Sequence, residues 1–183
     1  MSAVVYSDQI SVVVFDVDGV LTDGRLHVSA DGERVKSFHA HDGVAVALLR
    51  AHGIRSAILS GKHSEALTWR VTQLRVDAVV TGCHDKRTGF ESIKQQLRVD
   101  DMQTAYVGDD VNDLCVIERV GVSYAPADAH ALVRSRVSHV TSRAGGEGVA
   151  REVADHILTC GGLSLEDAYR PLFQLWSRHD VTQ

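Results

Sequence analysis

The sequence predicts an α/β fold in which helices cover both faces of a doubly wound parallel sheet. Continuous apolar runs rich in β-branched residues recur along the 183-residue chain, beginning with Val12-Val13-Val14-Phe15. Such runs are typical of strands that are buried on both faces. Helical stretches lie between them, and strands that alternate with helices indicate right-handed βαβ units. In sheets of this kind, ligands bind beyond the carboxyl ends of the strands.

The elements can be assigned in chain order. After the first strand, residues 25–29 and 33–39 flank Ala30-Asp31-Gly32, which favours a β-hairpin turn. Helical stretches at residues 44–52 and 93–98 end before Gly53 and Asp100. The remaining strands are expected at residues 56–59, 77–80, 105–107 and 122–125.

The C-terminal segment is expected to be a helical extension. Residues 1–160 make up the predicted domain, and residues 161–183 make up the extension. Ser164-Leu165-Glu166-Asp167 has the pattern of a helix N-terminus, and Pro171 is expected to kink this helix or delay its start. The apolar side chains of the extension need a surface to bury against.

Composition excludes several classes of protein. Lys and Arg number 19 against 24 Asp and Glu, and the resulting net charge of −5 argues against a general nucleic-acid-binding protein. No apolar run approaches the roughly 18 residues of a membrane span, and the N-terminus lacks the pattern of a signal peptide. Cys83, Cys115 and Cys160 form no CxxC pair, which fits a reducing compartment without a zinc site. We therefore expect a cytoplasmic protein that binds neither nucleic acid nor membranes.

Acidic, hydroxyl and lysine residues follow the expected strands. They lie in the segments Asp16-Val17-Asp18-Gly19, Ser60-Gly61-Lys62, Asp85-Lys86 and Gly108-Asp109-Asp110-Val111-Asn112-Asp113. Because the carboxyl ends of parallel strands converge, these segments predict one site. Clustered carboxylates repel one another unless a cation lies among them, and oxygen ligands without His or Cys favour Mg²⁺. A magnesium ion, a lysine, a hydroxyl and backbone N–H groups suit phosphoryl transfer, with one carboxylate as nucleophile and another as proton donor and acceptor.

These residues carry a resemblance to a known superfamily. Asp16-x-Asp18-Gly19-x-Leu21-Thr22, Ser60, Lys86 and Gly108-Asp109-Asp110-x-x-Asp113 resemble the four motifs of the haloacid-dehalogenase phosphohydrolases, in order and in spacing. Further segments are similar to 3-deoxy-D-manno-octulosonate 8-phosphate phosphatases, namely Asp23-Gly24, Lys36-x-Phe38, Asp42-Gly43, Ala125-Pro126-Ala127-Asp128-Ala129, and Gly145-Gly146-x-Gly148 with Arg151-Glu152. The resemblance implies a Rossmann-like phosphatase domain over residues 1–160. It also implies Mg²⁺-dependent hydrolysis of a small anionic sugar-acid phosphate, 3-deoxy-D-manno-octulosonate 8-phosphate, through an aspartyl-phosphate.

Residue roles follow from the same resemblance. It implies that Asp16 is the nucleophile and that Asp18 protonates the leaving group and later deprotonates water. It also implies that Ser60 and Lys86 bind the phosphoryl oxygens. The implied magnesium ligands are Asp16, the backbone carbonyl of Asp18, and Asp109, with Asp110 or Asp113 in support. Asp113 could equally cap a helix that begins near Asn112. The residues implied to meet the sugar acid are His39, Ala40, His41, Asp42, Gly43, Lys62 and Arg70.

The number of residues between the motifs bears on how the site is closed. Only 41 residues lie between Asp18 and Ser60, and 22 lie between Lys86 and Asp109, so neither gap can hold a folded cap domain. An aspartyl-phosphate gains from a site that controls water. We therefore expect a capless enzyme whose site a neighbouring subunit closes, with the hairpin as a contact, and the resembling family implies a homotetramer.

The sequence leaves other substrates and other functions open. A nonulosonate 9-phosphate of the sialic-acid type is the nearest rival substrate. A receiver-type signalling domain also combines clustered carboxylates, a hydroxyl residue and a lysine, but its phosphorylated Asp would follow the third strand, where this chain has Thr81-Gly82. A non-catalytic partner subunit would suit the C-terminal helix. The segment Gly145-Gly146-Glu147-Gly148 fits either a flexible loop or a binding site for a partner's phosphate or carboxylate.

Overall fold

The computed structural model describes residues 9–179 and contains one parallel sheet. Its strands are β1 (Val12–Phe15), β4 (Arg55–Leu59), β5 (Ala78–Val80), β6 (Thr104–Val107), β7 (Val122–Ala125) and β8 (His139–Val140). Their order is β5-β4-β1-β6-β7-β8, so the chain leaves the central β1 towards one edge and then returns to build the other. This confirms the doubly wound parallel sheet. The reversal of strand order beside β1 creates the crevice where such folds bind ligands.

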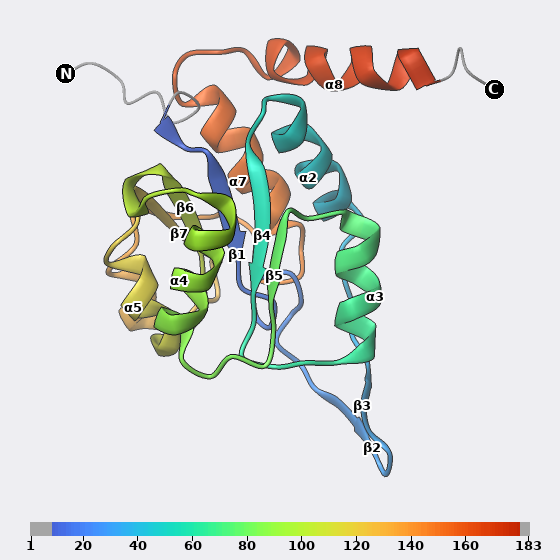
Figure 1. Cartoon of the computed structure of the whole chain (residues 1–183), viewed down its shortest axis with the longest axis vertical. Coiled ribbons are helices and arrows are strands. Elements are labelled where there is room, and N and C mark those ends of the chain that lie inside the picture. The colour runs from blue at the N-terminus through green and yellow to red at the C-terminus, as the bar shows by residue number, and fades with distance from the viewer. Residues whose placement is uncertain (1–8, 180–183) are drawn as a thin grey trace.

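Helices cover both faces of this sheet (Figure 1). They are α2 (His41–Ala51), α3 (Glu65–Leu74), α4 (Lys86–Leu97), α5 (Leu114–Ile117), α6 (Ala131–Arg134), α7 (Val149–Thr159) and α8 (Leu165–His179), with 3₁₀ turns η1 (Asp101–Gln103) and η2 (Val111–Asp113). The sequence does not predict the short elements β8 and α6, whereas the helix considered near Asn112 is present as η2 followed by α5. None of the helices within residues 9–179 is long and apolar enough to cross a membrane.

Helix α4 begins seven residues earlier than the apolar pattern predicts, at Lys86 rather than residue 93. Its first turn is polar, and the side chain of Asp85 caps it by accepting a hydrogen bond from the Arg87 amide at 3.1 Å. Gly89 lowers the local helix propensity. A Cβ atom at Gly89 would lie 2.5 Å from Leu59 Cδ1, so the glycine allows α4 to pack closely on the sheet. This packing places Lys86 at the carboxyl edge of the sheet.

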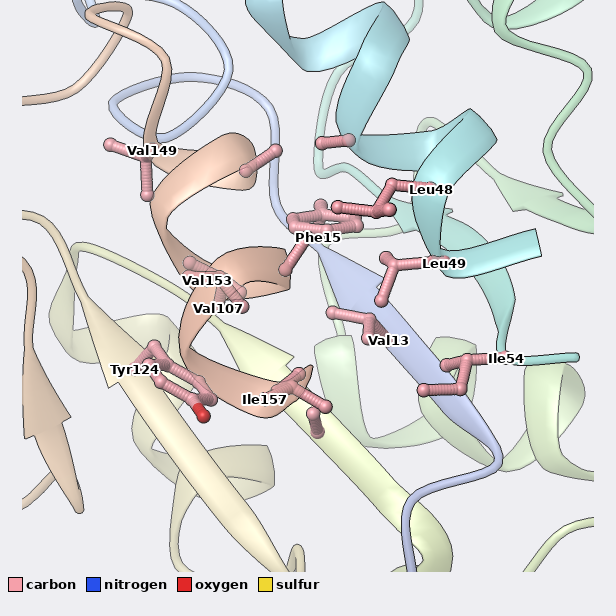
Figure 2. Packing of buried hydrophobic residues seen from close by; sticks show 14 of the residues in the cluster. Val13, Phe15, Leu48, Leu49, Ile54, Val107, Tyr124, Val149, Val153 and Ile157 are labelled. Atoms are coloured by element: carbon pink, nitrogen blue, oxygen red, sulfur yellow. The ribbon is translucent and has the colours of Figure 1, made fainter. Parts of the chain in front are cut away.

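The side chains of β1 alternate between two hydrophobic clusters, as expected for a strand buried on both faces. Val13 and Phe15 pack on one face, and Val12 and Val14 pack on the other. Figure 2 shows Val13 and Phe15 pointing between α2 and α7. All four side chains are at most 1% exposed, so β1 is a rigid base for the residues that follow it.

The expected hairpin is present and consists of β2 (His27–Ser29) and β3 (Gly32–Val35). Its strands are shorter than the sequence predicts. The hairpin projects away from the sheet (Figure 1), and it carries the exposed apolar side chains Leu26, Val28 and Val35. Between Asp18 and Ser60 the structure contains this hairpin, α2 and β4 but no cap domain.

The C-terminal extension forms α8, which packs across α2 and α7 (Figure 1). Ser164 caps it by accepting a hydrogen bond from the Asp167 amide at 3.1 Å. Pro171 lies inside the helix and does not delay its start. Ala168 and Leu172 are buried in the cluster that also contains Val13 and Phe15. The extension therefore shares the domain core, while the division at residue 160 stays a prediction.

Candidate active site

A cavity of about 280 Å³ opens at the carboxyl ends of β1, β4 and β6. Segments from four parts of the chain line it: Asp16, Asp18, Gly24, Ser60, Gly61, Lys62, Lys86, Asp109, Asp110 and Asn112. The strand ends thus bring together the predicted residues of the four motif segments, except Asp113. Asp113 lies beside this cavity, where it contacts Lys86.

Lys86 connects two carboxylates beneath the cavity. Its Nζ atom lies 2.7 Å from Asp16 Oδ1 and 2.6 Å from Asp113 Oδ1, and its side chain is 1% exposed. Burial alone would lower the pKa of Lys86, but the charges of Asp16 and Asp113 raise it above its ordinary value. The ammonium is therefore charged at neutral pH and fixed beside Asp16.

Asp113 organises the loop after β6. Its Oδ1 accepts hydrogen bonds from Lys86 and from the Tyr106 hydroxyl, both at 2.6 Å. Its Oδ2 accepts hydrogen bonds from the backbone amides of Asp109 at 3.0 Å and Asp110 at 3.2 Å. Because protein donors occupy both oxygens, this geometry favours a supporting role over direct metal ligation.

The carboxylates form a cluster suited to a divalent cation. Asp16, Asp109 and Asp113 each offer an oxygen, and these atoms lie within 4.8 Å of one another. Burial raises the pKa of Asp109 to about 8, and the neighbouring charges of Asp16 and Asp113 add to the effect. Burial also raises the pKa of Asp16 to about 6, although Lys86 opposes it. A cation among these oxygens would offset their repulsion.

A glycine-rich loop supports the turn after β1. A Cβ atom at Gly145 would lie 2.1 Å from the Gly19 carbonyl oxygen, and the Gly146 amide donates a hydrogen bond to the Val20 carbonyl at 3.0 Å. Gly19 has a φ of +88°, and a Cβ atom there would lie 2.1 Å from Asp109 Oδ2. The segment of residues 145–148 therefore packs against the turn that carries Asp16 and Asp18.

Comparison with known proteins identifies the family. Residues 54–153, more than half of the chain, match the haloacid dehalogenase-like hydrolases. The chain is 43% identical to the 3-deoxy-D-manno-octulosonate 8-phosphate phosphatase KdsC of Haemophilus influenzae over 157 residues, which cover 86% of this chain and 87% of that protein. This protein belongs to the haloacid dehalogenase-like hydrolases. It is a phosphatase of that family.

Solved structures of related phosphatases share the fold of this hydrolase. The cobalt-bound deoxy-D-mannose-octulosonate 8-phosphate phosphatase of Haemophilus influenzae has a TM-score of 0.85 and 39% identity, over 94% of this chain and 99% of that chain. The Moraxella catarrhalis 3-deoxy-D-manno-octulosonate 8-phosphate phosphatase in complex with magnesium, phosphate and KDO has a TM-score of 0.80 and 29% identity, over 85% and 89%. Both structures therefore match this hydrolase over most of its length.

Of the residues that the resemblance assigned to the sugar acid, only one lines the cavity of this hydrolase. Lys62 lines the cavity, whereas His39, Ala40, His41, Asp42, Gly43 and Arg70 are not among its lining residues. Arg70 donates a hydrogen bond to the His39 carbonyl at 3.0 Å. Asp42 is buried, which raises its pKa to about 7 although Arg70 opposes the shift. Their contact with substrate stays a prediction.

Sequence reasoning missed two polar residues of this site. The Tyr106 hydroxyl bonds Asp113, but Tyr106 lies inside an apolar strand and therefore resembles an ordinary core residue. Lys36 Nζ lies 2.5 Å from Asp18 Oδ1 and 2.8 Å from Glu33 Oε1. In the sequence, Lys36-x-Phe38 contributes only to the family resemblance, because no local pattern shows that a residue of the hairpin reaches the end of β1.

Proposed function

We propose that this hydrolase is a Mg²⁺-dependent phosphomonoesterase that converts 3-deoxy-D-manno-octulosonate 8-phosphate into the free sugar acid and phosphate. The observation that carries the proposal is the pairing of buried Lys86 with Asp16 in a cavity that Asp18, Ser60 and Asp109 also line. A lysine and clustered carboxylates suit a phosphoryl group that reacts by in-line displacement. The names and bound molecules of the relatives support the choice of substrate.

In the proposed reaction, an Asp16 oxygen attacks phosphorus and forms an aspartyl-phosphate while the bond from phosphorus to the sugar oxygen breaks. Asp18 donates a proton to the departing alkoxide and then accepts one from the water that hydrolyses the intermediate. Lys86 fixes Asp16 and, with Ser60, binds phosphoryl oxygens. Preorganised donors of this kind stabilise the charge that develops in the transition state.

The carboxylate cluster is the proposed magnesium site. Asp16, the backbone carbonyl of Asp18, and Asp109 would hold the ion, with Asp110 and Asp113 in support. When bound, Mg²⁺ supplies positive charge to the phosphoryl oxygens. Asp113 holds the backbone of Asp109, so its support acts through the position of that ligand.

We propose that the sugar-acid end meets cations, beginning with Lys62 at the cavity. A homotetramer in which a neighbouring subunit closes the site is supported by the projecting hairpin with its exposed Leu26, Val28 and Val35. In such an assembly, substrate would also reach the segment of residues 39–43 and Arg70. The cytoplasmic location stays a prediction.

Metal binding is expected to stabilise the protein more at high pH. A carboxyl group whose pKa is higher in the folded than in the unfolded protein binds more protons when folded. The raised values for Asp16 and Asp109 therefore lower stability as pH rises from about 4 to about 8 in the metal-free protein. Mg²⁺ binds the ionised carboxylates, so we expect it to raise Tm more at about pH 8 than at about pH 5.

Thermal unfolding with EDTA and with Mg²⁺ across this range measures the effect. Asp109→Asn is the control, because it removes the carboxyl whose pKa is raised most and should reduce the Mg²⁺-dependent shift. An equal Mg²⁺ effect at both ends of the pH range would contradict the assignment of these carboxylates.

Substrate choice is tested by phosphate release from a panel of sugar-acid phosphates and ordinary sugar phosphates, each with Mg²⁺ and with chelator. We expect selective, Mg²⁺-dependent turnover of 3-deoxy-D-manno-octulosonate 8-phosphate. Faster turnover of a nonulosonate 9-phosphate would keep the mechanism and change the substrate. No release from any ester, together with a stable phosphoprotein formed from a small phosphodonor, would replace the proposal with a signalling role.

A further inference from the structure

The charged side chain of Lys36 is buried at the base of an otherwise exposed hairpin. It directly follows β3, where Val35 is 58% exposed and, on the paired strand β2, Val28 is 71% exposed. The Lys36 side chain is only 1% exposed. Such a burial of an ammonium group is costly unless partners compensate for the lost water.

The compensation comes from two carboxylates. Lys36 Nζ lies 2.5 Å from Asp18 Oδ1 and 2.8 Å from Glu33 Oε1. Glu33 pairs with Val28 across the hairpin, so the acid that anchors Lys36 belongs to the hairpin ladder. Asp18 belongs to the turn after β1 and lines the cavity. Lys36 therefore links the hairpin to the proposed acid and base.

We propose that Lys36 is a positioning residue that holds the Asp18 carboxylate in the orientation needed for proton transfer. The inference rests on the proposed function of Asp18. Lys36 is not among the residues that line the cavity, so it acts on the reaction through Asp18 and not on the substrate.

The geometry explains why such a residue is needed. Gly145 and Gly146 pack against the turn that contains Asp18, but the Asp18 carboxylate can still rotate about two side-chain bonds. The Lys36 ammonium donates a hydrogen bond to Oδ1 and leaves Oδ2 to carry the proton that passes to the leaving group. A proton donor that is misplaced by about 1 Å loses much of its rate advantage. The hairpin thus contributes to the chemistry through one side chain.

The test combines Lys36→Met with Asp18→Asn in a double-mutant cycle. General acid–base catalysis contributes roughly 10²–10⁴-fold, and we expect Lys36→Met to lose at least about 10-fold in kcat on the alkyl phosphate that the protein hydrolyses fastest. In the Asp18→Asn background, the same change should cost less than about 2-fold, because the group that Lys36 positions is gone. Lys36→Arg, which keeps the charge, should recover part of the rate.

A second readout uses the leaving group. p-Nitrophenolate departs without a proton, so the first turnover of p-nitrophenyl phosphate should be much less sensitive to Lys36→Met than the first turnover of the alkyl ester. Lys94→Met is the matched control. Lys94 also lies between two carboxylates, Glu91 and Asp101, and it lies outside the cavity. We expect this variant to keep both rates.

The possible results distinguish a failure of the positioning role from a failure of the proposed function. Multiplicative losses from Lys36→Met and Asp18→Asn, or equal losses on both leaving groups, would overturn the positioning role and leave the proposed function standing. Wild-type turnover by Asp18→Asn would instead overturn the assignment of the acid and base, and the role of Lys36 with it. Circular dichroism and Tm identify a variant that has failed to fold, and Lys36→Arg then supplies the comparison.

Discussion

Asp16→Asn is expected to abolish turnover and to leave the fold intact. The amide is nearly isosteric with the carboxylate but cannot form the aspartyl-phosphate, and loss of a covalent nucleophile costs at least about 10³-fold in kcat. Asp16 is buried and its pKa is raised to about 6, so a neutral side chain should be tolerated there. Lys86 keeps Asp113 as a partner in the variant.

Phosphate release under Mg²⁺, together with Tm, measures this expectation. Asp110→Asn makes the same chemical change at the same cavity, but the Asp110 side chain caps η2 through the Val111 amide. We expect it to lose less than about 10-fold, as for a group that acts indirectly. Rapid quenching of the wild-type protein should also trap a phosphoryl group on Asp16. Wild-type rates in Asp16→Asn would defeat the mechanism.

Much of the fold could be predicted because local sequence determines it. The strand of residues 12–15 has the predicted bounds, since a continuous β-branched run has few alternatives to a buried strand. Once the sheet is parallel, its topology brings Asp16, Ser60, Lys86 and Asp109 to one edge. The site could thus be located without knowledge of any side-chain contact.

Other features depend on contacts between distant segments and have no local signal. The early start of α4 depends on the close packing that Gly89 allows against Leu59. The contact of Lys36 with Asp18, in the turn after β1, depends on how the hairpin folds back towards the sheet. From the sequence, residues 145–148 fit either a flexible loop or a binding site for a partner's phosphate or carboxylate. Only the structure shows how closely Gly145 approaches Gly19.

Lys86→Met is the second change with a large expected effect, and it should affect both activity and stability. Removal of one preorganised charge that stabilises the transition state costs about 10²-fold or more in kcat. The variant also leaves Asp16 and Asp113 buried without their shared cation, and breaking a buried ion pair costs about 3–5 kcal/mol. Phosphate release and denaturant unfolding measure the two effects separately. In the control Lys94→Met, the lost ion pairs are more exposed, and we expect a smaller loss of stability and no loss of rate.

The losses of activity and of stability in Lys86→Met have different causes and can be separated by a second substitution. If the loss of stability comes from unpaired carboxylates, then adding Asp113→Asn to Lys86→Met should restore part of the free energy of unfolding, because one buried charge is removed. The same double variant should stay inactive, since nothing replaces the ammonium beside Asp16. Mg²⁺ should likewise restore part of the Tm of Lys86→Met without restoring its rate. Recovery of turnover by either route would mean that Lys86 serves only to neutralise the cluster and takes no part in the reaction.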